Sequence, residues 1–215
     1  MNSSDRKTVI HRARRGRRRE TLNSSKLAAL GVLLLIGCAP AFPEAQSRGW
    51  DFAVFAAAAT GEENTNFFSE AQILGGGVFL GKALTGEMGR GWRRGRLEFG
   101  ADFLPVFVQL APQRIYGVGL DPMVLRWNSS QHRGRVTPFL ELAGGGLHTS
   151  RNLPAGDTSH FNFIARAGGG LQVATGNAQA FEIACRWWHI SNANLGTSNP
   201  EFNGIQVSLG WHWFK

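Results

Sequence analysis

Residues 96–103 read RLEFGADF and residues 161–173 read FNFIARAGGGLQV, and in both stretches apolar and polar side chains alternate. Successive side chains of a β-strand point to opposite faces, so this period of two indicates strands with one apolar and one polar face. The apolar faces hold Leu97, Phe99, Ala101, Phe103, Phe161, Phe163, Ala165, Ala167, Leu171 and Val173, and the polar faces hold Arg96, Glu98, Asp102, Asn162, Arg166 and Gln172. Because helical spacing is absent, the two stretches predict β-structure.

The same alternation continues on both sides of these stretches, and Gly, Asn, Pro and Ser interrupt it at intervals. Such interruptions are typical of the turns between strands. Eight alternating segments can be counted, at about 50–60, 71–84, 92–109, 115–128, 135–149, 160–175, 178–191 and 203–214. The 215-residue chain is therefore predicted to be all-β, with eight antiparallel strands in one domain.

The composition of the two faces indicates which one meets lipid. The polar face mixes both signs of charge, at Arg96, Glu98, Asp102, Glu141, Arg166, Glu182 and Arg186. Aromatic residues cluster near the strand ends, at Trp50, Trp92, Trp127, Trp187, Trp188, Trp211, Trp213 and Phe214. Charges paired inside a small barrel and an apolar band facing lipid explain both features, so a transmembrane β-barrel is expected. A soluble, lipocalin-like barrel of eight strands is the alternative.

Residues 1–41 have the composition of a secretory signal peptide. A cluster of basic residues precedes the apolar run LAALGVLLLIG at 27–37, and small residues and proline follow it. These are the charged, apolar and cleavage regions of a signal. The apolar run is too short to cross about 30 Å of hydrocarbon as a helix. Export is therefore expected, with the barrel formed by residues 42–215 and located in a bacterial outer membrane.

Two processing sites compete within the leader. Ala39-Pro40-Ala41 offers a small-x-small cleavage site, whereas residues 35–38 resemble a lipobox whose Cys38 would carry lipid. Ordinary cleavage is favoured because a barrel supplies its own membrane anchor. Cys185 would then be the one remaining cysteine, and no intramolecular disulfide is expected.

The leader also accounts for the net charge of +8. It holds nine of the 23 basic and two of the 15 acidic residues, which leaves 14 basic and 13 acidic residues in the remainder. Binding to nucleic acid depends on a concentration of positive charge. The nearly neutral body therefore predicts no nucleic-acid partner.

Three glycine triplets, at 75–77, 144–146 and 168–170, each lie inside a predicted strand. Glycine in a strand permits bending or close approach of another backbone, so we interpret the triplets as devices for curvature. Residues 76–82 also match the beginning of a P-loop. Ala83 stands where that motif needs a hydroxyl for magnesium, so nucleotide binding is not expected.

The candidate chemistry lies in residues 186–204, RWWHISNANLGTSNPEFNG. His189 and Ser191 are two residues apart near a strand end, so both side chains leave the apolar face, with Cα atoms about 6.6 Å apart. Serine becomes a nucleophile when an adjacent base removes its proton. Asn192 and the backbone amides of residues 193–196 are placed to bind an oxyanion. Two polar groups on a lipid-facing surface favour a functional site over a merely polar strand end.

This stretch resembles the lipid A 3-O-deacylase family, also called acyloxyacyl hydrolases. The sequence His189-Ile190-Ser191-Asn192-Ala193, on the seventh of eight strands and followed by a polar loop and a last strand, carries the resemblance. The similarity covers roughly residues 186–214, and residues 95–107 and 136–146 fit more loosely. It implies that His189 is the base, that Ser191 is the nucleophile and that Asn192 lies near the oxyanion. It also implies a site on the outer wall of the barrel and lipid A, or lipopolysaccharide, as the partner.

The residue that orients the histidine departs from the family pattern. Family members place a glutamate 14 residues after the histidine, and that spacing leads here to Asn203. Alignment on Gly204-Ile205 leads instead to Gln206, which alternation turns into the lumen. Glu201 is the one nearby carboxylate. Asn203 is favoured because it combines the ungapped spacing with the outward parity, and Glu201 and Gln206 are the alternatives.

Two further functions stay open at this stage. A His-x-Ser-Asn motif with asparagine as third member also resembles outer-membrane phospholipase A, although that enzyme has twelve strands and uses calcium. A small barrel without enzymatic activity is the other alternative. The remaining histidines lack the spacing of metal ligands, so neither a metal nor a cofactor is expected. The sequence does not decide whether the barrel forms a homodimer or which acyl ester is cleaved.

Overall fold

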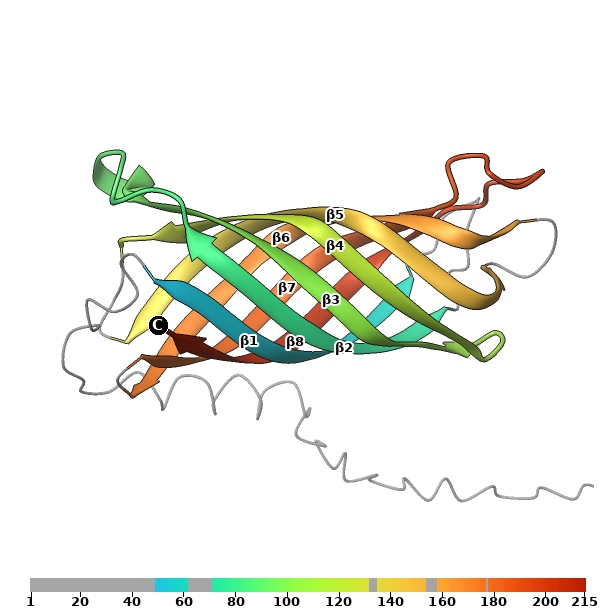
Figure 1. Cartoon of the computed structure of the whole chain (residues 1–215), viewed down its shortest axis with the longest axis horizontal. Coiled ribbons are helices and arrows are strands. Elements are labelled where there is room, and N and C mark those ends of the chain that lie inside the picture. Colours follow the sequence, from blue (N-terminus) through green and yellow to red (C-terminus); the bar gives the residue numbers. More distant parts are fainter. Residues whose placement is uncertain (1–48, 62–70, 132–134, 154–157, 177) are drawn as a thin grey trace, which may run out of the picture. The chain divides into compact units, whose positions relative to one another are not determined.

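The computed structural model describes residues 49–61, 71–131, 135–153, 158–176 and 178–215, and these form a closed antiparallel barrel (Figure 1). The strands are β1 Trp50–Gly61, β2 Gln72–Ala83, β3 Gly95–Ala111, β4 Ile115–Ser129, β5 Val136–Leu153, β6 Ser159–Gly176, β7 Gln179–Ser191 and β8 Phe202–Phe214. Each strand pairs with its neighbours in sequence, and β8 closes the barrel onto β1. The predicted all-β, eight-stranded architecture is confirmed. The predicted signal peptide, residues 1–41, lies outside the described residues.

Two strand boundaries differ from the sequence prediction. The third strand begins at Gly95 rather than at residue 92, because residues 91–93 form a short 3-10 turn, η3 Gly91–Arg93. Positive φ angles at Gly89 and Gly91, 84° and 57°, turn the backbone there. The fifth strand continues past residue 149 to Leu153. Within the described residues, no helix is long and apolar enough to cross a membrane.

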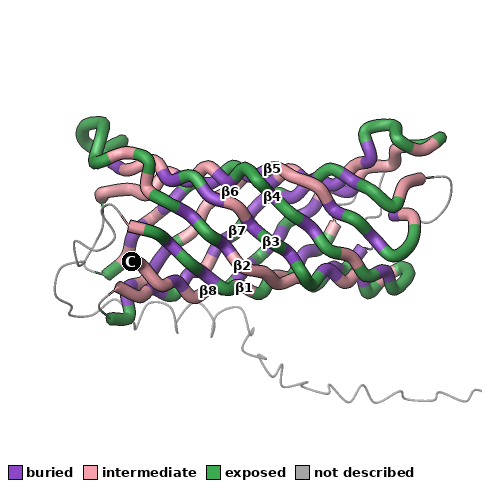
Figure 2. The backbone as a smooth tube through the Cα atoms, viewed as in Figure 1, coloured by how far each residue is buried: buried purple, intermediate pink, exposed green. Residues whose placement is uncertain are grey.

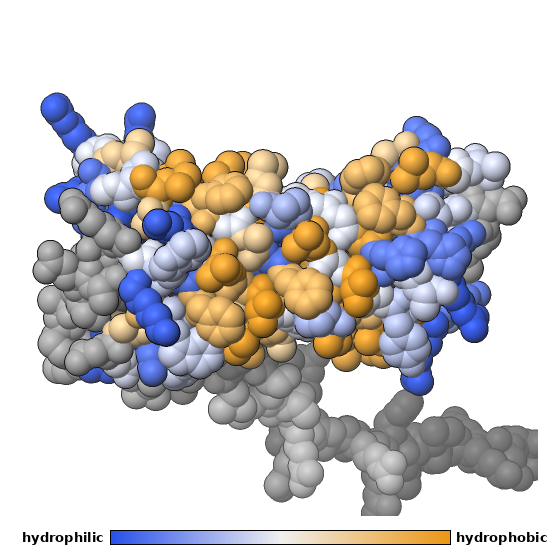
Figure 3. All heavy atoms as spheres, in the orientation of Figure 1, coloured by the Kyte–Doolittle hydropathy of each residue, from blue (hydrophilic) through white to orange (hydrophobic). Residues whose placement is uncertain are grey.

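The two faces of the strands are divided as the alternation predicts. Burial alternates along the strands, with interruptions at the glycine triplets and at the bulges (Figure 2). Phe99, Phe103 and Phe163 are exposed on the outside, whereas Glu98, Asp102 and Arg166 are buried in the lumen. On the face drawn in Figure 3, hydrophobic side chains gather along the middle of the barrel and hydrophilic ones lie toward both ends. This pattern matches a band that contacts lipid.

The luminal charges of one half of the barrel form a paired network. Glu141 accepts hydrogen bonds from Arg126 Nη2 at 2.6 Å and from Arg186 Nε at 2.7 Å. His212 lies in the lumen and bonds Glu182 Oε2 at 2.9 Å, and Glu182 also pairs with both arginines. A buried charge without a partner is costly, so the mixture of signs along the polar face reflects mutual neutralisation inside the barrel.

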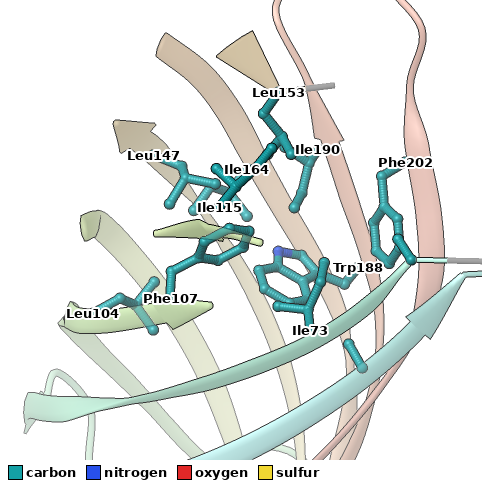
Figure 4. Close-up of a cluster of buried hydrophobic side chains, with 12 residues drawn as sticks. Ile73, Leu104, Phe107, Ile115, Leu147, Leu153, Ile164, Trp188, Ile190 and Phe202 are labelled. Carbon is teal, nitrogen blue, oxygen red and sulfur yellow. The ribbon is translucent and has the colours of Figure 1, made fainter. Parts of the chain in front are cut away.

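The other half of the lumen is filled by apolar side chains (Figure 4). This luminal cluster consists of Ala59, Ala71, Ile73, Leu104, Phe107, Ile115, Leu147, Leu153, Ile164, Trp188, Ile190 and Phe202. Trp188 packs edge-on against Phe107 and Phe202, with ring centroids 6.1 Å apart in both pairs. Trp188 is only 3% exposed, so this aromatic residue, although it lies near a strand end as predicted, does not face lipid. The alternation along β7 places the Trp188 side chain on the inner face of the barrel.

The glycine triplets lie inside β2, β5 and β6, as predicted. At Gly145 an added Cβ would lie 2.0 Å from the carbonyl oxygen of Leu120, which belongs to the neighbouring β4. The register between β4 and β5 shifts at this point, between Leu120 and Met123. Glycine therefore permits a close backbone approach where the strand bulges. Residues 76–82, the P-loop-like fragment, are part of β2 rather than of a loop.

Candidate active site

His189, Ser191 and Asn203 lie together on the outer wall of the barrel. The barrel has a terminal end, where Trp50 begins β1 and Phe214 ends β8, and a far end, which carries the β7–β8 connection. The three residues lie where β7 ends and β8 begins, at the far end; this end of the barrel is at the right in Figure 1. His189 Nε2 is 3.0 Å from Ser191 Oγ, and His189 Nδ1 is 2.8 Å from Asn203 Oδ1. All three are half-buried.

Strand pairing brings these side chains together. His189 and Asn203 are direct cross-strand partners in β7 and β8, so their side chains leave the sheet side by side. On the other side of His189, β6 contributes Ala165, whose small side chain leaves space for the imidazole. Trp187 stacks on the imidazole, with centroids 5.6 Å apart and an interplanar angle of 21°. The ring is thus held from two directions.

The hydrogen bonds define a direction for proton movement. The amide oxygen of Asn203 can only accept, so Nδ1 of His189 carries the proton and donates it. Nε2 is then unprotonated and accepts the hydroxyl proton of Ser191. This is the tautomer that a histidine needs in order to act as general base toward a serine. The arrangement can therefore activate Ser191 for attack on a carbonyl carbon.

The other two candidates for the orienting group lie elsewhere. Gln206 is buried in the lumen opposite Arg186, as its parity predicts. Glu201 is half-buried at the last loop position before β8, and His189 Nδ1 bonds Asn203 instead. Within the described part of the chain, no group of three or more His, Cys, Asp or Glu side chains could hold a metal ion.

Asn192 is 1% exposed and points away from the face that carries Ser191. Its Nδ2 donates to the Ser198 carbonyl at 2.9 Å, and its Oδ1 accepts from the Asn194 amide at 2.9 Å. Its own amide donates to Asn199 Oδ1 at 2.8 Å. Asn192 therefore shapes the loop that follows Ser191. Its role toward an oxyanion stays a prediction.

The inward neighbours of the site residues anchor both strands. Trp188 and Ile190 alternate with His189 and Ser191 on β7, and Phe202 precedes Asn203 on β8. All three inward side chains belong to the luminal cluster (Figure 4). Because this cluster is packed inside a closed barrel, the backbone that carries the outward triad has little freedom to move. The period of two in the sequence suggested which residues point inward, but not that they meet one another.

An apolar groove, which we call the outer groove, begins beside the site. It has a volume of about 590 Å³ and crosses β3 to β6. Its lining consists of Phe103, Val118, Gly119, Leu120, Pro122, Gly145, Gly146, His148, Phe161 and Phe163. Phe163 is the cross-strand partner of Ser191, so the outer groove lies next to the serine hydroxyl. Sequence reasoning identified its phenylalanines as lipid-facing but gave no signal that four strands combine to form a groove.

These features define a class of protein: an eight-stranded membrane barrel with a Ser-His-Asn site on its outer wall. The family model of lipid A 3-O-deacylase (PagL) matches residues 80–212, more than half of the chain. The chain therefore belongs to this family, and it is an outer-membrane protein.

Solved structures resemble the fold. The outer membrane enzyme PagL matches with a TM-score of 0.54 and 19% identity, over 74% of this chain and 97% of that chain. Neisserial surface protein A matches with a TM-score of 0.47 and 14% identity, over 78% of this chain and 97% of that chain. A comparison with curated protein sequences gave no match.

Proposed function

We propose that this protein hydrolyses the ester that links the 3-O-acyl chain to lipid A, with Ser191 as nucleophile and His189 as general base. The observation that carries the proposal is the continuous hydrogen-bond chain from Asn203 through His189 to Ser191 on a lipid-facing wall. A triad in this place meets acyl esters without withdrawing them from the membrane. Membership of the lipid A 3-O-deacylase family supports lipid A as the substrate.

The proposed reaction has two stages. The Oγ of Ser191 attacks the ester carbonyl carbon while Nε2 of His189 takes its proton. The tetrahedral intermediate collapses, the bond to the sugar oxygen breaks, and His189 returns the proton to that oxygen. Water, deprotonated by His189, then attacks the carbonyl carbon of the acyl-serine. The bond to Ser191 Oγ breaks, His189 returns the proton to Oγ, and the fatty acid is released. Asn203 orients the imidazole throughout, but it lacks the negative charge with which a carboxylate would stabilise the imidazolium.

The intermediate needs hydrogen-bond donors for its oxygen. The backbone amides of Asn194 and Leu195 are engaged with Asn192. The amide of Ala193, the second residue after Ser191, donates to none of the described residues, and its residue is exposed. Positive φ angles at Ala193 and Asn194, 49° and 63°, form a turn that presents this amide. We assign Ala193 as the first oxyanion donor, with Asn192 holding the turn in shape.

The outer groove is the proposed seat of the acyl chain. Phe163 is 44% exposed beside Ser191, and Phe161 packs edge-on against it at 5.3 Å. An acyl chain lying against these rings and along Leu120 would bring its ester to the serine. Inside the membrane, an acyl chain leaves other lipid tails for the protein only if it packs more closely against the protein than against those tails. A groove provides such packing, whereas a flat wall would not.

The test is hydrolysis by purified barrel in detergent of lipid A and, separately, of phospholipid, with the products analysed by mass spectrometry. Ser191→Ala and His189→Ala should each lower 3-O-deacylation by several orders of magnitude, as in other serine triads. Ser150→Ala, at an exposed serine near the same end, is the matched control. Hydrolysis that persists in both site variants would refute the proposed site. Release of fatty acid from phospholipid alone would instead identify a phospholipase A-like esterase.

A further inference from the structure

The connection between β2 and β3, at the terminal end, has an ordered structure of its own (Figure 1, upper left). Met88 and Gly95 exchange backbone hydrogen bonds of 2.9 and 3.0 Å, and the 3-10 turn η3 lies at the tip. The two residues that follow β4 hold this extension in place. Ser130 N donates to Arg94 O at 2.8 Å, and Gln131 Nε2 donates to Gly91 O at 3.0 Å.

The extension closes one side of a second groove, which we call the Trp92 groove. Its volume is about 440 Å³, and its lining consists of Trp92, Arg93, Trp127, Ser129, Pro138, Phe139 and Leu140. Trp92 is 78% exposed and Leu140 is 65% exposed. The groove therefore combines an apolar wall, formed by β4 and β5, with tryptophan and arginine at its rim. Tryptophan is typical of the boundary between hydrocarbon and headgroups.

The rim carries an excess of positive charge. Residues 84–96 contain four arginines and one acidic residue, Glu87. Glu87 forms ion pairs with Arg94 and Arg96. A hydrogen bond from the Ser130 hydroxyl, followed by the nearby arginines, lowers the pKa of Glu87, so this carboxylate stays charged. Glu87 therefore pairs with two of the four arginines, Arg94 and Arg96.

The other two arginines face outward. Arg90 and Arg93 are exposed, and neither forms an ion pair with any residue that the structure describes. The guanidinium of Arg93 lies over the ring of Trp92, 5.0 Å from its centroid. This stacking orients the planar group at the mouth of the Trp92 groove. A guanidinium binds phosphate through two parallel hydrogen bonds, which makes it the side chain of choice for such a ligand.

We propose that the Trp92 groove binds one anionic phospholipid, with an acyl chain along Trp127 and Leu140 and the phosphate on Arg90 and Arg93. The lipid is assigned to the leaflet at the terminal end. If the far end cleaves lipid A in the outer leaflet, the terminal end lies in the phospholipid leaflet, and this placement rests on the proposed function. The binding itself does not, because the groove and its charge lie at the opposite end from His189.

The test uses native mass spectrometry of barrel released from micelles that contain phosphatidylglycerol or phosphatidylcholine. The Ser191→Ala chain is used, so that no lipid is consumed. One phosphatidylglycerol should be retained in preference to phosphatidylcholine. Since each arginine near an anionic lipid contributes about fivefold, Arg90→Gln with Arg93→Gln should weaken retention about 25-fold. Equal retention of the two lipids would overturn the proposal.

The matched control is the double variant Arg114→Gln with Arg151→Gln, which removes the same charge from exposed positions at the far end. It should leave phosphatidylglycerol retention unchanged. An equal loss in both double variants would show that net charge alone is responsible and would overturn the site. A third measurement adds glycerol phosphate in solution as a competitor. If it displaces the lipid completely, the groove binds phosphate alone and the proposed role of the apolar wall is contradicted. None of these outcomes depends on hydrolysis.

Discussion

Replacement of Asn203 tests the proposed orienting role most directly. Asn203→Ala removes the acceptor 2.8 Å from Nδ1 of His189. A neutral hydrogen bond contributes about 0.5–1.5 kcal/mol, and about 1.4 kcal/mol corresponds to a factor of ten in rate. The bond alone therefore accounts for about a two- to tenfold effect. Without the acceptor, the tautomer and the ring orientation of His189 are no longer fixed. We therefore expect kcat to fall about 10- to 100-fold in total.

For Asn203→Asp, the same geometry predicts the opposite effect on kcat. Aspartate places a carboxylate oxygen where the amide oxygen lies now, and a charge-assisted hydrogen bond is roughly twice as strong as a neutral one. The carboxylate also stabilises the imidazolium that forms when Ser191 attacks. We expect kcat to equal that of the wild type or to exceed it by up to about tenfold.

The assay is the initial rate of fatty-acid release from lipid A at saturating substrate. Heat-modifiable migration of each variant on gels serves as the control for barrel assembly. Glu201→Gln is measured alongside and should be silent. If Asn203→Ala keeps the wild-type rate while Glu201→Gln is crippled, the triad is Ser-His-Glu and the reasoning from strand register is refuted.

Three further predictions concern the groove, the core and the bulge. Val118→Trp, which fills the outer groove, should raise KM for lipid A several-fold, whereas Val207→Trp on the lipid-facing wall of β8 should not; equal effects would exclude the groove as the acyl seat. Trp188→Ala should lower the free energy of unfolding by about 3–5 kcal/mol, measured by denaturant titration in detergent, and an unchanged midpoint would contradict the packing. Gly145→Val should prevent heat-modifiable assembly because its Cβ would lie 2.0 Å from a carbonyl oxygen, whereas Gly176→Val, with open space around it, should assemble.

The alternation in the sequence predicts most of the barrel because it is a local property. A strand shows its two faces within a few residues, so Phe99 and Glu98, or Phe163 and Arg166, are divided correctly without knowledge of any neighbour. The same rule places His189 and Ser191 on one face. The boundary predicted at residue 92 is wrong because Gly89 and Gly91 turn the backbone and residues 91–93 form a 3-10 turn, so the strand begins only at Gly95.

The sequence by itself determined the number of strands, the face on which most side chains lie and the two residues of the candidate nucleophile and base. Only the tertiary structure decided that Asn203, rather than Glu201 or Gln206, contacts His189, because that contact depends on the register between β7 and β8. The luminal cluster around Trp188 and the outer groove likewise draw on several strands that are far apart in the chain. Such contacts depend on how the strands pair and close into a barrel. A slip of two residues between neighbouring strands would leave every side chain on the same face, so the alternation in the sequence cannot distinguish one such register from another.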